Sequence, residues 1–150
     1  MMLQMISNNL ARYCNVAARC CLSTTRSENE VTLSYELNDK HKSNRALIIA
    51  HGLFASKTTW KSLAKRLNEQ TKYKVFTVDM RNHGSSYPYT NEMNYVAMAR
   101  DLRRFIQQVV IEQHKSASVA LMGHSMGGKA SMAFALDQVN YLIYPFLPRF

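Results

Sequence analysis

The residues with the clearest chemistry form a G-x-S-x-G segment at positions 123–127, between an apolar run and a helical pattern. A serine between a strand and a helix lies on a sharp turn that exposes its hydroxyl. The strand and the helix approach closely there, so the flanking positions need very small residues, which Gly123 and Gly127 supply. The pattern predicts Ser125 as a nucleophile that forms an acyl-enzyme. An ordinary N-cap serine is the alternative.

A serine that attacks an acyl carbonyl needs two hydrogen-bond donors where negative charge develops on the carbonyl oxygen. The backbone N–H of Met126, at the start of the helix, is predicted to be one of these oxyanion donors. A backbone N–H after the H-G pair at 51–52 is predicted to be the other, with Leu53 as first candidate and Phe54 as second. Phe54 and His124, which adjoin these groups in sequence, are predicted to contact the substrate. Three methionines are candidates for an apolar acyl pocket: Met80, Met122 and Met126.

The same residues permit two other interpretations. Positions 123–129 also spell G-x-x-x-x-G-K, most of a phosphate-binding loop, but the hydroxyl that would hold magnesium is replaced by Ala130. His51, His83 and His124 each follow an expected strand, yet their spacing matches no local zinc signature. We therefore predict neither a metal nor a cofactor, and expect His51 and His83 to hydrogen-bond turn backbone.

The elements that must position these residues alternate between strands and helices. Alternation of apolar and polar residues predicts a half-buried strand at 31–37, and apolar runs predict strands at 46–50, 74–79 and 118–122. Helical spacing predicts helices around 60–67, 96–110 and 126–136, the second capped by Thr90 or Asn91. This order favours an α/β fold with a mostly parallel sheet and flanking helices. Ligands bind beyond the carboxyl ends of such strands, where the candidate residues are expected to converge.

Three motifs in chain order resemble the α/β-hydrolase fold: H-G-L-F at 51–54, D-M-R-N-H-G-S at 79–85 and G-H-S-M-G-G-K at 123–129. Within that fold the chain is most similar to the mitochondrial abhydrolase-domain subfamily, which is diacylglycerol-lipase-like and related to YbfF-like esterases. The similarity covers roughly residues 31–137. It implies a serine esterase or lipase acting on carboxylic esters of acylglycerol or lipid type, with a small-molecule ester as its partner.

The resemblance also implies an acidic residue and a catalytic histidine after later strands. Residues 138–150 do not follow the family's pattern, and we interpret them as a divergent tail after a hydrolase region at 28–137. The sequence thus predicts the N-terminal half of the fold, incomplete on its C-terminal side, with little or no activity of this truncated chain. The alternative is a non-catalytic isoform that binds acyl groups or lipids or acts as a regulator.

Residues 1–27 carry three arginines and no acidic residue, and their apolar residues fall on one stripe of a helix. The arginines recur on the opposite side, which is typical of a mitochondrial transit peptide and predicts a matrix location. All three cysteines of the chain lie in this segment. Its removal would leave the hydrolase region without disulfides or thiolate ligands.

The remaining charge is scattered. The net charge is +9, and we interpret most of it as solvated helix faces. No aromatic-basic motif of a nucleic-acid module is present, so no nucleic-acid partner is expected. The sequence predicts no membrane span, leaves peripheral contact with an anionic membrane open, and does not indicate an oligomeric state.

Overall fold

A computed structural model describes residues 30–143 of the chain, with side chains through residue 137. A compact unit begins at Val31. The predicted transit peptide at 1–27 lies outside the described residues, as do residues 144–150 of the predicted tail, so both stay predictions. Within the part that the structure describes, no helix has the length and apolar character needed to cross a bilayer.

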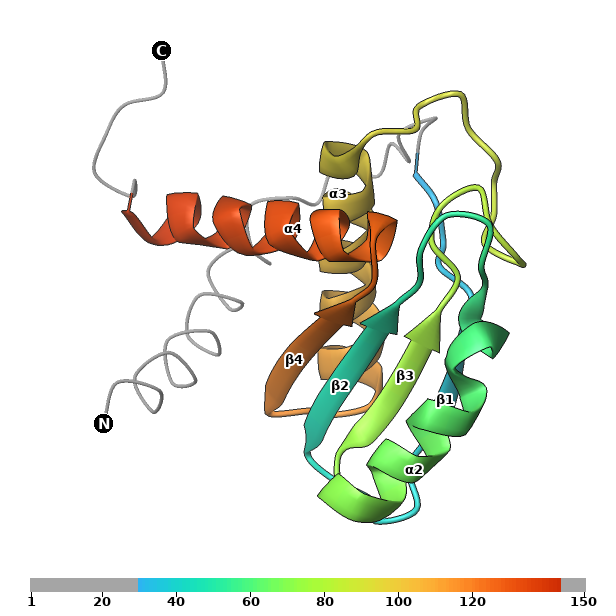
Figure 1. Ribbon diagram of the computed structural model, residues 1–150. Helices are drawn as coiled ribbons and strands as arrows, with labels where there is room; N and C mark the ends of the chain where they lie inside the picture. Colours follow the sequence, from blue (N-terminus) through green and yellow to red (C-terminus); the bar gives the residue numbers. More distant parts are fainter. Residues whose placement is uncertain (1–29, 144–150) are drawn as a thin grey trace. The chain divides into compact units, whose positions relative to one another are not determined.

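Four strands form one mixed sheet (Figure 1). They are β1 (Tyr35–Asn38), β2 (Arg45–Ala50), β3 (Lys74–Val78) and β4 (Ser118–Gly123). The order across the sheet is β1-β3-β2-β4, with β2 parallel to both of its neighbours and β1 antiparallel to β3. The mostly parallel sheet predicted from the sequence is confirmed.

The register of the sheet brings the three candidate motifs to one edge. Ala50, the last residue of β2, pairs with Val78 of β3 and with Gly123 of β4. The three parallel strands therefore end level with one another, and their arrowheads point to the same edge in Figure 1. The loops that begin at 51, 79 and 124 consequently start side by side, as expected for a ligand site in a parallel sheet.

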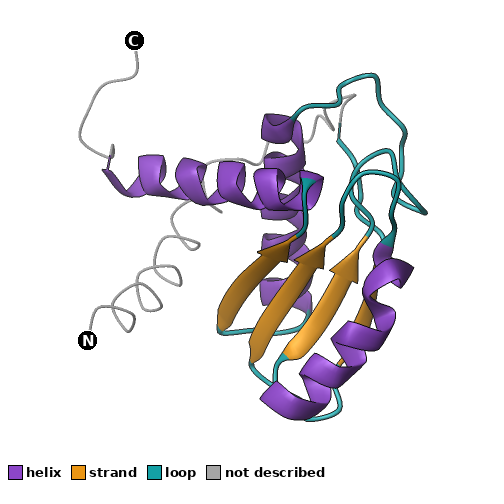
Figure 2. Cartoon of the chain, viewed as in Figure 1, coloured by secondary structure: helices purple, strands orange, loops and turns teal. Residues whose placement is uncertain are grey.

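The helices lie on both faces of the sheet (Figure 2). They are the 3₁₀ turn η1 (Lys57–Trp60), α2 (Lys61–Thr71), α3 (Tyr95–Phe105), the π-helix η2 (Ile106–Gln113) and α4 (Met126–Ile143). The helix α4 runs past the predicted end at 136 into the first residues of the predicted tail. The long helix predicted at 96–110 is α3 followed by η2, so its hydrogen bonding changes after Phe105.

The cap of α3 corrects the sequence prediction. Asn94, not Thr90 or Asn91, is the N-cap, with an extended backbone at φ −139° and a side chain that accepts the N–H of Ala97. The segment before it is held elsewhere, because the side chain of Asn82 bonds the backbone of Thr90 in both directions. The helix can therefore begin only after this loop ends.

The first strand is shorter than the predicted 31–37. Regular pairing begins at Tyr35, whereas Thr32 exchanges backbone hydrogen bonds with Tyr87 as an isolated bridge. The N–H of Ser34 donates to the hydroxyl of Ser86 at 2.9 Å. The residues before β1 thus pair with the loop after β3 rather than with β3 itself, which fixes one side of that loop.

Alternation along β2 divides the core between the two faces of the sheet. Ile48 is fully buried in a cluster that includes Met98 and Leu102 of α3. Its neighbour Ile49 belongs to a second cluster with Ala64 of α2. Successive side chains of a strand point to opposite faces, so helices cover both faces of β2, as its continuous apolar run predicts.

Candidate active site

Ser125 occupies the turn between β4 and α4. Its φ is +49°, a left-handed conformation that is costly for a residue other than glycine, and the residue is exposed. Two hydrogen bonds tie this turn to the end of β2: the N–H of His124 donates to the carbonyl of Ala50 and the N–H of Gly127 to that of His51, both at 3.0 Å. The sharp bend predicted at the serine is therefore present and is held by the central strand.

The two glycines of the motif lie where no side chain fits. A Cβ on Gly123 would lie 2.4 Å from the carbonyl oxygen of Gly127, and a Cβ on Gly127 would lie 2.4 Å from that of Ala50. The contacted atoms are backbone, so they cannot rotate away as a flexible side chain could. The close approach of strand and helix inferred from the sequence is confirmed.

The residues whose amides are predicted as oxyanion donors both lie beside Ser125. Met126 is the first residue of α4, so its N–H has no partner within the helix. Leu53 lies in the turn that the N–H of Ala55 closes onto the carbonyl of Gly52 at 3.3 Å. Within residues 30–143, neither the Met126 amide nor the Leu53 amide has a hydrogen-bond partner. Both residues line the same pocket as Ser125.

His51 fixes the direction of the Leu53 amide. The N–H of Met80 donates to Nε2 of His51 at 3.0 Å, so the ring proton is on Nδ1, which donates to the carbonyl of Gly52 at 2.7 Å. In a trans peptide the N–H points opposite to the carbonyl, and the Leu53 N–H therefore points away from His51. Burial lowers the pKa of His51 below its usual value, against the opposing effect of the bond to Gly52, so the ring is neutral at pH 7.

His51 thus serves the turn backbone, as the sequence predicts. His83 behaves alike, since its Nδ1 lies 2.8 Å from the carbonyl oxygen of Arg81. The rings of His51 and His83 meet edge to face at 5.0 Å between centroids. Across residues 30–143, no group of three or more histidine, cysteine or acidic side chains is placed to hold a metal ion.

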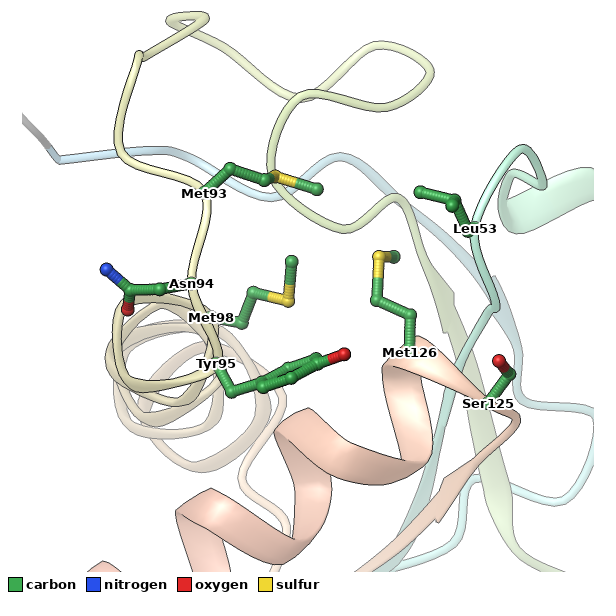
Figure 3. Close-up of a pocket in the computed structure, with 7 residues that line it drawn as sticks. All are labelled: Leu53, Met93, Asn94, Tyr95, Met98, Ser125 and Met126. Carbon is green, nitrogen blue, oxygen red and sulfur yellow. The ribbon is translucent and has the colours of Figure 1, made fainter.

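A pocket of about 300 Å³ opens beside Ser125 (Figure 3). Its lining residues are Leu53, Met93, Asn94, Tyr95, Met98, Ser125 and Met126. In Figure 3 the methionine side chains reach toward its centre, while the side chain of Asn94 is turned away. Its volume is at the lower end of the range for small-molecule sites, and its lining is mainly apolar.

The structure corrects part of the predicted acyl pocket. Met126 lines the pocket, but Met80 is fully buried in the core and Met122 packs against the α2 side of the sheet. Met122 precedes the last residue of β4, and strand alternation turns its side chain toward that face. Met93 and Met98 line the pocket instead of Met80 and Met122.

Phe54 and His124 lie outside the pocket lining. Phe54 is 94% exposed at φ +59°, at the tip of the turn after β2. The ring of His124 packs beside that of Trp60, with 5.8 Å between centroids. Their contact with a substrate stays a prediction.

The sequence analysis missed the contribution of the start of α3, which supplies four of the lining residues: Met93, Asn94, Tyr95 and Met98. The predicted order of the elements could have indicated this contribution. The loop after β3 begins at the ligand-binding edge, and the helix that ends this loop starts close to that edge as well.

The loop after β2 is clamped to the loop after β3 by Asp79. Its buried carboxylate accepts the backbone N–H and the Nζ of Lys57, both at 2.6 Å, and the N–H of Ser85 at 2.9 Å. Gly84 is required here, since it has φ +53° and a Cβ on it would lie 2.2 Å from the carboxyl group. Burial opposes ionisation of Asp79, but the hydrogen bonds from Lys57 and Ser85 outweigh it and hold its pKa below the usual value.

Replacing Asp79 by asparagine is expected to lower the free energy of unfolding by about 2 kcal/mol at pH 7, because charge-assisted hydrogen bonds are lost. A carboxylate whose folded pKa is depressed stabilises the protein above its unfolded pKa, about 3.9, and this contribution disappears as the pH falls through the folded pKa. The difference between wild type and Asp79→Asn should therefore shrink in acid. Urea unfolding at several pH values measures it, with Glu69→Gln on the exposed face of α2 as control. An equal difference at all pH values would contradict the assignment.

The structure disfavours a phosphate-binding loop at 123–129. The N–H of Gly127 is already engaged with the carbonyls of His51 and His124. The Nζ of Lys129 lies over the ring of Tyr95 at 5.6 Å from its centroid. The Gly127 amide is therefore committed within the fold, and Lys129 is directed toward Tyr95.

Comparison with known proteins places the chain in the alpha/beta hydrolase fold family, whose sequence model matches residues 45–141. It is 42% identical over 106 residues to the mouse (Mus musculus) sn-1-specific diacylglycerol lipase ABHD11, covering 71% of this chain and 33% of that protein. The Xenopus tropicalis protein of the same name is 40% identical over 124 residues, which cover 79% of this chain and 37% of that protein. A solved marine microorganism esterase matches with TM-score 0.63 and 36% identity, over 73% of this chain and 38% of its own.

The chain thus belongs to the α/β-hydrolase family, with relatives in the diacylglycerol-lipase-like subfamily that the sequence predicts. It spans 37% of the length of the Xenopus tropicalis relative and 33% of that of the mouse relative. Lipase and esterase relatives indicate ester hydrolysis as the chemistry at the level of the family.

Proposed function

We propose that the whole protein hydrolyses carboxylic esters, with Ser125 as nucleophile. One observation carries the proposal: Ser125 and the residues of both candidate oxyanion amides, Met126 and Leu53, line a single pocket. Leu53 lies far in the sequence from the adjacent pair Ser125 and Met126. Their convergence on an exposed serine is what acyl transfer requires.

In this reaction Oγ of Ser125 forms a bond to the ester carbonyl carbon, and the carbonyl electrons move to oxygen. The N–H groups of Met126 and Leu53 stabilise that oxyanion. Collapse breaks the bond to the alcohol, which leaves with the proton of the serine hydroxyl, and water then hydrolyses the acyl-enzyme. A general base carries the proton. Among the side chains that the structure describes, through residue 137, none hydrogen-bonds to the Ser125 hydroxyl, and both His51 and His83 are engaged with backbone.

The substrate class we propose is a lipid ester of acylglycerol type. Leucine and methionine side chains beside Ser125 suit an apolar acyl chain. The relatives named as diacylglycerol lipases support the same class. The reaction needs no cofactor.

Incubating the folded protein with a fluorophosphonate tests the proposal, because the reagent phosphonylates activated serines. We expect the adduct on the peptide that contains Ser125, located by mass spectrometry, and none in Ser125→Ala. Ser85→Ala is the matched control, since Ser85 is an exposed serine of a neighbouring loop at the same edge of the sheet. An adduct elsewhere, or retained in folded Ser125→Ala, would exclude Ser125 as the nucleophile.

A further inference from the structure

The pocket beside Ser125 contains an uncommitted polar group that acyl transfer does not use. The carboxamide of Asn94 is engaged, accepting the N–H of Ala97 at 2.8 Å and donating to Glu92 at 3.2 Å. The hydroxyl of Tyr95, a residue that is 42% exposed, has no hydrogen-bond partner among the side chains and backbone that the structure describes over residues 30–137. Apart from Ser125, Tyr95 therefore brings the one free polar side chain to a pocket lined by sulfur and hydrocarbon.

The backbone position of Tyr95 and a contact on its ring face orient its side chain. The residue opens α3, directly after the N-cap Asn94, and its ring lies under the Nζ of Lys129 at 5.6 Å. Figure 3 shows its hydroxyl pointing across the pocket toward Met126, on the side where Ser125 lies. The phenol thus faces the place where a bound ester would react.

We propose that Tyr95 is a specificity-determining residue that hydrogen-bonds a hydroxyl on the alcohol part of the ester. The inference rests on the proposed function. An apolar acyl chain offers the phenol no partner, and the carbonyl oxygen of the ester is assigned to the Met126 and Leu53 amides, so the partner comes from the alcohol. An ester of a plain alkyl alcohol would desolvate the phenol without replacing its hydrogen bond to water, which disfavours binding. The pocket therefore selects esters of polyhydric alcohols over esters of simple alcohols.

A matched pair of soluble esters tests this. Glycerol monobutyrate and propyl butyrate share the acyl chain and the three-carbon alcohol skeleton, and differ in two hydroxyls. Dissociation constants are measured by NMR titration in a Ser125→Ala background, which prevents turnover. We expect Tyr95→Phe to reduce the preference for glycerol monobutyrate about fivefold, the factor that one ordinary hydrogen bond supplies. This variant keeps the ring under Lys129.

The control is Tyr89→Phe, which removes a hydroxyl that donates to the carbonyl of Gly84 and lies outside the pocket. It should leave the preference unchanged. An unchanged preference in Tyr95→Phe, or equal weakening of both esters, would overturn the inference while ester binding stands. Failure of glycerol monobutyrate to bind the folded protein with Tyr95 intact would overturn the inference together with the ester-binding part of the proposed function. The assignment of Ser125 as nucleophile is tested separately by labelling.

Discussion

Replacing Asp101 by asparagine is expected to lower the free energy of unfolding by about 3–5 kcal/mol, because it removes the buried carboxylate that balances the charge of the Arg81 guanidinium. Arg81 meets Asp101 through two bonds, Nε to Oδ2 at 2.6 Å and Nη2 to Oδ1 at 3.0 Å. Both side chains are almost fully buried. Urea unfolding followed by circular dichroism measures the loss.

The location of this pair extends its effect to the site. Arg81 follows β3, Asp101 lies on α3, and Nη1 of Arg81 also donates to the carbonyl of Glu92 at 2.6 Å. Glu92 directly precedes the pocket residue Met93. Loss of the pair should therefore loosen the pocket wall as well as the core.

The matched control removes both charges together. The double variant Arg81→Met and Asp101→Leu should lose clearly less stability than Asp101→Asn, because a buried pair replaced by apolar side chains leaves no uncompensated charge. A loss below about 1 kcal/mol in Asp101→Asn, the size typical of an exposed ion pair, would show that the pair does not hold the fold.

Replacing Gly127 by alanine is expected to cost about 3 kcal/mol or more, since the added methyl overpacks the contact between α4 and β2. Its Cβ would lie within 2.6 Å of three backbone atoms of Ala50 and His51, at the end of the central strand. Relief requires α4 to shift, and that movement would also displace Ser125. Unfolding in urea measures the stability change.

Gly128→Ala makes the same substitution one residue later in α4, where the closest atom to an added Cβ is the carbonyl oxygen of Gly123 at 3.2 Å. That contact needs only a small adjustment, and alanine gains helix propensity of up to about 1 kcal/mol over glycine. We expect a change within about 1 kcal/mol of wild type. Equal losses in both variants would show that the close approach at Gly127 is not the limiting contact.

The sequence by itself determined the strands, the sharp turn at Ser125 and the loops that carry the motifs. These features depend on local properties: continuous apolar runs, and glycines where a Cβ would collide with backbone. The small-residue requirement at Gly123 and Gly127 is readable because it arises within a few residues of the serine.

Only the tertiary structure decided what surrounds the serine. Tyr95 and Met98 reach the pocket because α3 begins near the carboxyl edge of the sheet, and Arg81 finds Asp101 across twenty residues of chain. Neither the Thr90 hydroxyl nor the Asn91 amide gave a local sign that Asn94 would cap α3 instead. Such pairings depend on strand register and helix packing, which bring together residues whose spacing in the sequence carries no signal.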